Sequence, residues 1–189
     1  MRMRYAIAGL IFALLYSCTP VPETEVALAS VTPATARIDA GLAAVTVEPA
    51  SRDRAVYPLP RSLTPLLPLW QAALQDAVTR QGIFRPEASR RVSIVVKVLE
   101  FSLSGKILSV FARYQLFADP ANNPVFSADI MSNAGLSSLA TGVTNLDDPA
   151  VATQNRTQVI RAIQDNITQF LDQLEGFARQ PRGTTPPRP

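Results

Sequence analysis

The sequence predicts an α+β domain whose elements follow the order β-α-β-β-β-α. Three segments between residues 92 and 132 alternate apolar and polar positions, and an apolar stripe at helical spacing lies on each side of them along the chain. Alternation with period two is typical of half-buried strands, whereas stripes at i, i+3, i+4 and i+7 are typical of amphipathic helices. We therefore expect one folded domain over residues 42–178, which is long enough to bury a core.

The first two elements are a short strand and a helix. The strand is expected at residues 42–47, ending before Pro49. Pro65 and Pro68 then mark a helix start, because proline is tolerated only in the first turn. Gly82 is a typical helix stop. The helix carries an apolar stripe of Leu67, Trp70, Leu74, Ala77 and Val78, and we interpret Trp70 as a core residue rather than a ligand platform.

The three central strands are expected to form an antiparallel meander. Their apolar faces consist of Val92, Ile94, Val96 and Val98, then Leu108, Val110, Ala112, Tyr114 and Leu116, then Phe126, Ala128 and Ile130. Residues 103–105 are typical of a three-residue hairpin loop, which would pair Ser102 with Lys106 and Val98 with Val110.

The second hairpin of the meander has a longer loop. Residues 119–123 are all common turn residues, so we expect Ala118 to pair with Pro124 and Leu116 with Phe126. Both registers keep the apolar residues on one side of the sheet, and a slip by one residue would break this arrangement.

The other side of the meander, which we call the mixed face, is the candidate contact surface. It combines apolar side chains with an Arg113–Asp129 cross-strand pair, which we expect to lie in one row with Val95. An exposed face of this kind indicates a binding surface, unless the following loop covers it. Its candidate residues are Val95, Lys97, Leu99, Phe101, Phe111, Arg113, Phe117, Asp129 and Met131.

The chain after the meander predicts a long loop, a helix and a tail. Residues 133–147 form a polar connection that is long for a compact domain. Asp148 and Pro149 are a typical N-cap and first helical residue. The stripe of this helix runs from Val159 to Leu174, the helix is expected to end by Gly176 or Phe177, and we interpret Asn166 beside the stripe as a surface or sheet-edge group. Residues 179–189 have four prolines and no apolar side chain except Pro, so we expect a disordered tail.

The N-terminal segment predicts export and lipid attachment. Arg2 and Arg4 precede a ten-residue apolar run, which is too short to span a bilayer and is typical of a secretion signal. Residues 15–18, Leu-Tyr-Ser-Cys, resemble the lipobox of bacterial lipoprotein precursors. The resemblance implies removal of residues 1–17, diacylglycerol on the sulfur of Cys18 and acylation of its amine. The alternative is an ordinary secreted protein whose only cysteine lies near the cleavage site.

The residues after Cys18 indicate which membrane holds the protein and how far the domain can lie from it. In Gram-negative bacteria an Asp directly after the acylated cysteine favours the inner membrane, so Thr19 favours the periplasmic face of the outer membrane. Residues 18–41 show neither strand nor helix periodicity, and we expect a flexible tether. A coil of that length has ends about 25–30 Å apart.

Composition excludes several classes of function. The chain has no histidine, which removes the commonest general base and metal ligand, and a lipidated Cys18 leaves no free thiol. Loss of Arg2 and Arg4 lowers the net charge from +3 to +1, which does not indicate a nucleic-acid partner. The acidic residues are scattered, and the Asp147-Asp148 pair alone lacks the ligand number for a cation. We expect no enzyme activity, no cofactor and no metal.

Three further segments carry a resemblance to small bacterial envelope lipoproteins. They are residues 70–74 before Gly82-Ile83-Phe84, residues 162–167 leading to Phe170-Leu171, and residues 98–101. The chain resembles the auxiliary lipoproteins of mammalian-cell-entry type ABC lipid transporters and the lipoprotein that plugs the lipopolysaccharide translocon. The resemblance implies a four-stranded, mostly antiparallel sheet with two helices packed on one face.

These observations predict a non-catalytic lipoprotein that serves as an accessory or docking subunit in envelope lipid transport or assembly. Its partners would be the membrane, through the lipid, and an envelope protein, either a transporter subunit or an outer-membrane protein. Two alternatives remain: a lipopolysaccharide-assembly lipoprotein bound to a barrel, and a periplasmic lipid carrier. A pocket between Phe101, Phe111 and Phe117 would favour the carrier.

Overall fold

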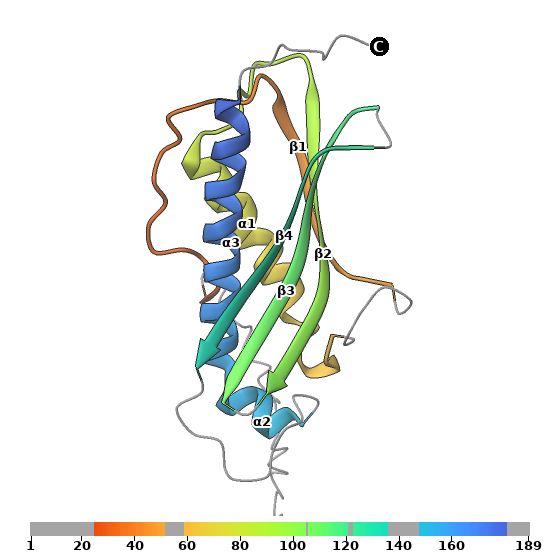
Figure 1. The fold of residues 1–189 in the computed structure, drawn as a ribbon, viewed down its shortest axis with the longest axis vertical. Helices are drawn as coiled ribbons and strands as arrows, with labels where there is room; N and C mark the ends of the chain where they lie inside the picture. The colour runs from red at the N-terminus through yellow and green to blue at the C-terminus, as the bar shows by residue number, and fades with distance from the viewer. Residues whose placement is uncertain (1–24, 52–58, 105, 121–122, 136–147, 181–189) are drawn as a thin grey trace, which may run out of the picture.

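The computed structural model describes residues 25–51, 59–104, 106–120, 123–135 and 148–180. It has two layers, a four-stranded sheet and two long helices that cover one of its faces (Figure 1). The α+β class and the order β-α-β-β-β-α are confirmed. The elements are β1 (Gly41–Pro49), the short 3-10 helix η2 (Arg61–Leu63), α1 (Leu66–Gln81), β2 (Arg91–Ser104), β3 (Ile107–Ala118), β4 (Pro124–Gly135), α2 (Pro149–Gln154) and α3 (Arg156–Arg179).

The sheet has the strand order β1-β2-β3-β4. β1 runs parallel to β2, because α1 carries the chain back across one face, and the other two pairings are antiparallel. The predicted register of β3 and β4 is confirmed, with Leu116 opposite Phe126 and Arg113 opposite Asp129. The sheet is therefore mostly antiparallel, as expected.

The predicted register of β2 and β3 is wrong. Val98 lies opposite Ala112, and the hairpin closes with Ser104 opposite Ile107. The register also shifts by one residue between Val98 and Glu100, which marks a β-bulge. The bulge reverses the alternation, so Phe101 points into the core, where only 4% of its surface is exposed. Burial of this aromatic side chain is the physical reason for the bulge, since an unbroken strand would place it on the opposite face.

The core lies between the sheet and the two helices. Trp70 of α1 is fully buried, and its ring meets that of Phe101 edge to face with 6.4 Å between centroids. The prediction that Trp70 is a core residue is thus confirmed. From α3, the ring of Phe170 stacks on that of Tyr114 at 4.3 Å. Such aromatic pairs stabilise a core by about 0.5–1.5 kcal/mol beyond the area that they bury.

The helix ends follow the predicted signals with two differences. Gly82 ends α1 in the left-handed conformation, with φ of 64°. Asp148 caps α2 by accepting a hydrogen bond from the Ala150 amide at 2.8 Å. The last helix is not continuous, however, because Asn155 separates α2 from α3, and α3 runs beyond the expected end at residues 176–177 to Arg179.

Asn166 is not the surface or sheet-edge group that the sequence suggests. It lies on the buried side of α3, with none of its surface exposed, and faces β3 and β4. Its amide nitrogen donates to the oxygens of Val110, Ile130 and Ser132 at 3.1–3.3 Å. A buried amide is tolerated only when it is hydrogen-bonded in this way, and here it ties the helix to the sheet.

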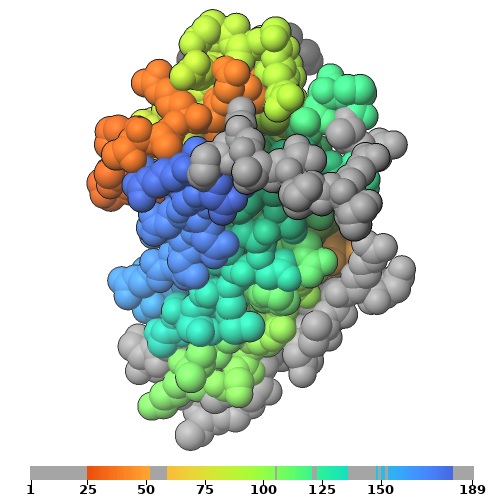
Figure 2. Space-filling view, turned by 45° about the horizontal axis from the view of Figure 1, so that its top comes forward, coloured from red at the N-terminus to blue at the C-terminus, as the bar shows by residue number. Residues whose placement is uncertain are grey.

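The flexible tether expected over residues 18–41 is corrected for its described part. Residues 25–40, which we call the strap, pack along α1 and α3, and Figure 2 shows them as orange atoms against the blue of α3. Val26 and Ile38 are at most 2% exposed. These two apolar side chains explain the docking, because they bury surface that a free tether would leave in water.

Several predictions fall outside the described residues. These are the signal peptide over residues 1–17, the lipidation site at Cys18, the tether over residues 18–24, most of the loop over residues 133–147, and most of the tail over residues 179–189. In the part of the chain that the structure describes, none of the helices combines the length and apolar character that a membrane crossing needs.

Candidate functional site

The candidate site lies on the open face, which is the side of the sheet turned away from α1 and α3 (Figure 1). Both helices pack on the opposite side, where they contact β1, β3 and β4. The alternation of the strands places charged and apolar side chains together on the open face. Its central members are Glu48, Lys97, Leu99, Phe111, Arg113, Gln115, Asp129 and Met131.

A row of four charged residues crosses all four strands at the middle of the open face. Glu48 of β1 is paired in register with Lys97 of β2, Lys97 with Arg113 of β3, and Arg113 with Asp129 of β4. We call these four residues the charge row. The two cations therefore lie side by side in the centre, and a carboxylate lies at each end. Two neighbouring cations repel each other, and the flanking carboxylates offset that repulsion.

Each cation of the charge row is held by the carboxylate beside it. Arg113 donates from Nε and Nη2 to the two oxygens of Asp129, at 2.6 and 2.7 Å. Lys97 donates from Nζ to Oε1 of Glu48. The bidentate hydrogen bond with Asp129 raises the pKa of Arg113, and the same bond lowers the pKa of Asp129. Arg113 and Asp129 are thus held in their charged forms, and the sheet fixes the orientation of the pair.

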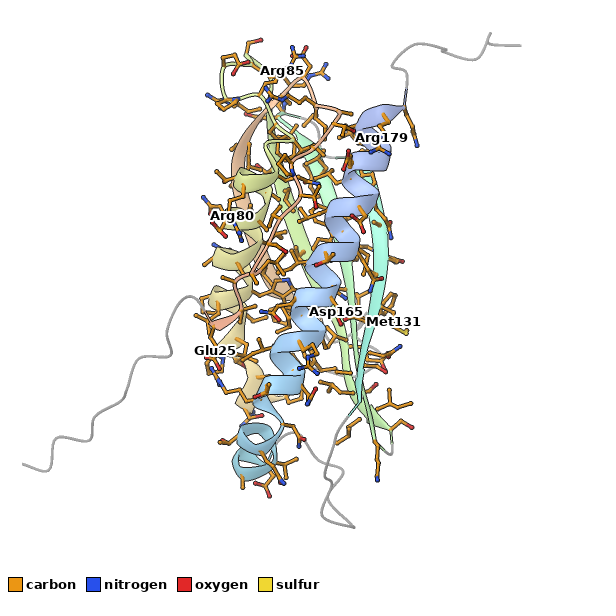
Figure 3. The ribbon with its side chains drawn as sticks, turned by 90° about the vertical axis from the view of Figure 1, so that its left-hand side faces the viewer. Glu25, Arg80, Arg85, Met131, Asp165 and Arg179 are labelled. Carbon is orange, nitrogen blue, oxygen red and sulfur yellow. The ribbon has the colours of Figure 1, made fainter. Side chains whose placement is uncertain are left out.

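Apolar side chains border the charge row on the side toward the β2–β3 hairpin. Leu99 is the unpaired residue at the bulge of β2, and Phe111 and Met131 follow on the neighbouring strands, where they are paired in register. Met131 is 52% exposed, whereas Leu99 retains only 8% exposure. In Figure 3 the labelled Met131 lies on the side of β4 opposite to α3. The site therefore presents charge and apolar surface next to each other.

A hollow of about 460 Å³ lies where the charged and apolar residues meet. Its walls come from the central strands and from the chain directly after β1, whose Ala50 amide donates to the Val98 carbonyl at 2.8 Å. A hollow of this size could take a side chain of a partner or a small ligand. It is lined by Ala50, Ser51, Lys97, Leu99, Phe111, Arg113 and Gln115.

The structure brings together only part of the predicted mixed face. Four of its nine residues line the hollow, namely Lys97, Leu99, Phe111 and Arg113. Asp129 and Met131 lie beside them on β4. Val95 and Phe117 lie farther along the same face, since Val95 is paired with Gln115 and Ser93 with Phe117.

Phe101 has to be removed from the predicted face, because the bulge turns it into the core. The expected row of Val95, Arg113 and Asp129 is likewise corrected, because Lys97 is the residue paired with Arg113. A pocket between Phe101, Phe111 and Phe117 is therefore not formed.

Sequence reasoning missed four residues of the site. Glu48 belongs to the charge row, and Ala50, Ser51 and Gln115 line the hollow. The face of Glu48 could have been predicted, because a first strand with Val45 and Val47 in the core must point residue 48 to the other face, although the alternation does not show which strand lies beside it. Ala50 and Ser51 carry no such signal, since they follow the strand in an irregular segment.

A second hollow lies at the opposite end of the sheet, where α1 ends and β1 and β2 begin. It measures about 360 Å³, and its lining combines apolar residues with Arg37 and Arg91. Its lining consists of Arg37, Leu42, Val78, Thr79, Gly82, Phe84, Pro86 and Arg91. Among the described residues, no group of three or more His, Cys, Asp or Glu side chains is placed to hold a metal ion.

Comparison with known proteins supports the fold. No protein-family model matches the chain, and no curated protein matches it. The crystal structure of protein XCC0632 from Xanthomonas campestris, described with the family model DUF330, matches with a TM-score of 0.51 and 11% identity. The match covers 82% of this chain and 95% of that chain. At this level of identity the likeness concerns the fold alone, and it shows that this chain has a fold known from a bacterial protein.

Two other solved structures are more distant. A PelC dodecamer from Paraburkholderia phytofirmans has 17% identity and a TM-score of 0.42, with 80% of this chain and 96% of that chain covered. A minor lipoprotein from Acinetobacter baumannii has 16% identity and a TM-score of 0.35, with 70% and 90% covered. These values are too low to transfer an assembly or an activity to this chain.

Proposed function

We propose that this chain is a non-catalytic, lipid-anchored protein of the bacterial envelope that binds a partner protein through the open face of its sheet. The observation that carries the proposal is the charge row, which crosses all four strands beside Leu99 and Phe111. A fixed pattern of charges next to apolar side chains, here the half-buried Phe111 and the exposed Met131, is typical of an interface between proteins.

The physical role of the charge row is recognition. Lys97 and Arg113 are each already paired, so the row is neutral as a whole and does not attract anions in general. A partner with the complementary order of charges could contact all four groups at once, whereas one with a different order would meet like charges. The affinity would come mainly from the neighbouring apolar residues, because partly exposed ion pairs each contribute only about 0–1 kcal/mol.

The membrane anchor in this proposal is Cys18. The lipobox-like sequence at residues 15–18 supports acylation there, and Thr19 supports the periplasmic face of the outer membrane. Two or more acyl chains hold a protein stably, since each buried methylene contributes about 0.8 kcal/mol. Anchoring confines the open face to a thin layer above the bilayer, which raises its effective concentration toward a partner in the same membrane.

We further infer that the partner belongs to envelope lipid transport or envelope assembly. This inference depends on the resemblance of residues 70–84, 98–101 and 162–171 to auxiliary lipoproteins of that kind. The second candidate is a lipopolysaccharide-assembly role, in which the open face would lie inside an outer-membrane barrel. The lipid-carrier alternative loses its main argument, because Phe101 is buried in the core and no longer shares a face with Phe111.

The test is affinity purification of the full-length, membrane-anchored protein, with mass spectrometry of the proteins and lipids that it retains. We expect Phe111→Asp and Arg113→Glu to abolish retention of the partner while the far-ultraviolet circular dichroism stays native. The matched control is Arg161→Glu, which makes the same charge change on the exposed side of α3. Retention by all three variants would overturn the proposal.

The identity of what is retained separates the alternatives. An ABC permease or a substrate-binding envelope protein would support the transport role. An outer-membrane barrel would support the assembly role. Phospholipid in a one-to-one ratio without a protein would instead support a carrier and contradict docking.

A further inference from the structure

The strap runs along the domain from the first turn of α3 to its last. At one end, Glu25 accepts two hydrogen bonds from the Arg156 guanidinium, at 2.6 and 2.9 Å. At the other end, Thr35 donates to Glu175 from its amide and its hydroxyl, at 3.0 and 2.7 Å. Glu175 lies 19 residues after Arg156 along α3, so these two attachments are about 30 Å apart. The chain therefore enters the described domain at the N-terminal end of α3.

Contacts with α3 and α1 hold the strap between these two ends. The Gln164 amide donates to the Ala27 carbonyl at 3.0 Å, and the Arg80 guanidinium donates to the Leu28 carbonyl at 2.8 Å. Farther along, the Ala34 amide donates to the Gln81 carbonyl at 2.8 Å. These contacts fix the path of the strap, and in Figure 3 Glu25 lies in the lower half of the molecule, whereas Arg85 lies at the top.

The tip of the β2–β3 hairpin lies at the same end as Glu25. Phe170 stacks on Tyr114, and eight residues earlier in α3 the Ala162 carbonyl accepts a hydrogen bond from Ser132, which is paired with Val110. The first residue of α3, Arg156, therefore lies toward the same end of the domain as the first residue of β3, Ile107. The entry point of the chain and the hairpin tip therefore form one end of the molecule.

We propose that this end of the domain, which carries Ser104, Lys106 and Ile107 at the tip of the β2–β3 hairpin, faces and touches the lipid bilayer. The proposal depends on the acylation of Cys18 proposed above. Only six residues separate Cys18 from Glu25, and seven steps of chain span at most about 25 Å even when fully extended. Glu25 must therefore stay within that distance of the membrane, whereas the opposite end is free to stand well above it.

The chemistry of the hairpin tip fits a lipid surface. Ile107 is 53% exposed, which makes it one of the most exposed large apolar side chains among the described residues. Lys106 precedes it and is also exposed. An apolar side chain beside a cation suits the boundary between acyl chains and anionic headgroups. The exposed side of α3 carries Arg161, Asp165 and Asp172 instead, so it offers no apolar surface on which the domain could lie flat.

In this orientation the strands run away from the membrane surface, so the open face is roughly perpendicular to it. Arg113 lies six residues from Ile107 along β3, so the charge row would stand about 20 Å above the tip. A partner would then have to present its binding surface sideways and at that height. The hollow with Arg37 and Arg91 would point away from the bilayer.

The test measures the depth of three labels in the full-length, acylated protein on phosphatidylglycerol-containing vesicles. Ser104→Cys, Ser127→Cys and Ser89→Cys are matched changes at exposed serines, and each would carry one environment-sensitive fluorophore. Ser104 ends β2 and Ser89 lies two residues before its start, so the two labels are about 45 Å or more apart along the strand. We expect spin-labelled lipids to quench the label at residue 104 several-fold more than the label at residue 89, with residue 127 between them.

Two outcomes would overturn the orientation: equal quenching at the three positions, or stronger quenching at residue 89. Mass spectrometry of the Cys18 peptide keeps this result separate from the proposed anchor, because an acylated protein with reversed quenching contradicts the orientation alone. On the Ser104→Cys background, Lys106→Glu with Ile107→Asp should reduce the quenching several-fold. Unchanged quenching in that variant would show that the tip does not touch the lipid.

Discussion

The hydroxyl of Tyr114 donates a hydrogen bond to Oδ1 of Asn166 at 2.8 Å, and both residues are fully buried between β3 and α3. Burial raises the pKa of Tyr114, so its hydroxyl stays protonated and remains a donor. Ser132 extends the cluster by accepting from the Asn166 amide at 3.1 Å and donating to the Ala162 carbonyl at 2.7 Å. Because each group has partners in fixed directions, the cluster fixes the position of α3 on the sheet.

The first prediction is that Asn166→Ala lowers the free energy of unfolding by about 2–3 kcal/mol, because it leaves the buried Tyr114 hydroxyl without its acceptor. Urea unfolding followed by circular dichroism measures the change. The control is Asp165→Ala on the exposed side of the same helix turn, which we expect to stay within about 0.5 kcal/mol of the wild type. Equal effects of the two substitutions would contradict a structural role for the cluster.

The fold could be predicted from sequence where periodicity and end signals agree. The alternation in residues 108–130 fixed the register of β3 and β4, and Gly82 marked the end of α1. The bulge after Val98 could not be predicted in this way, because Leu99 and Phe101 are both apolar and either could face the core. Which of them does so depends on Trp70, which is far away in the sequence and packs against Phe101.

The second prediction compares two phenylalanines that the sequence placed on one face. Phe101→Ala should lower the free energy of unfolding by about 3–5 kcal/mol, because it leaves a cavity beside Trp70. Phe111→Ala should cost about 1 kcal/mol or less, because Phe111 lies half-buried on the open face. Urea unfolding of both variants measures the difference. Similar losses of stability in the two variants would mean that Phe101 is not more deeply buried than Phe111, and hence that the bulge does not turn Phe101 into the core.

The candidate site could be predicted only where it depends on β3 and β4. Arg113 and Asp129 are paired as expected, because the turn residues between these strands and the apolar alternation agree on one register. Glu48 was missed, since nothing in a short first strand shows which strand it will join. The strap was missed for a related reason: its large buried residues, Val26 and Ile38, are separated by an alanine-rich, proline-containing sequence without periodicity.

The third prediction concerns the strap and pH. The hydrogen bonds from Arg156 lower the pKa of Glu25, and those from Thr35 and Arg179 lower the pKa of Glu175 to about 2. A carboxylate whose pKa is lowered by folding stabilises the folded state above its unfolded pKa, and this contribution is lost as the pH falls through the folded value. The strap should therefore be fully attached above about pH 5 and should loosen progressively toward pH 2.

Hydrogen exchange, corrected for the intrinsic effect of pH, measures this release at two strap amides. The amides of Ala34 and Ile38 donate to the carbonyls of Gln81 and Ile83, at 2.8 and 2.7 Å. We expect their protection to fall between pH 5 and pH 2, while that of the core strands falls less. In the double variant Glu25→Gln with Glu175→Gln, protection should be weaker at pH 7 and nearly independent of pH. If amide protection in that variant still changed with pH as it does in the wild type, the release of the strap would have to come from other titratable groups.

The fourth prediction uses two glycines at the ends of the two long helices. Gly82 has φ of 64°, and a Cβ added there would meet no atom within 4 Å. Gly82→Ala should therefore cost about 1–2 kcal/mol through its backbone conformation alone. Gly176 lies on the exposed side of α3, where an added Cβ is equally unobstructed. Gly176→Ala should stabilise the protein by up to about 1 kcal/mol, because alanine loses less backbone entropy in a helix.

Thermal unfolding of the two glycine variants tests whether α1 and α3 end where the structure places them. Both substitutions add the same methyl group in open space, so opposite signs can come only from the backbone. A destabilising Gly176→Ala would mean that α3 ends near residues 176–177, as its sequence suggested, with the glycine in a left-handed turn. Stabilisation by Gly176→Ala would instead support a helix that continues to Arg179. The guanidinium of Arg179 donates a hydrogen bond to Glu175 at 2.7 Å, beside the end of the strap.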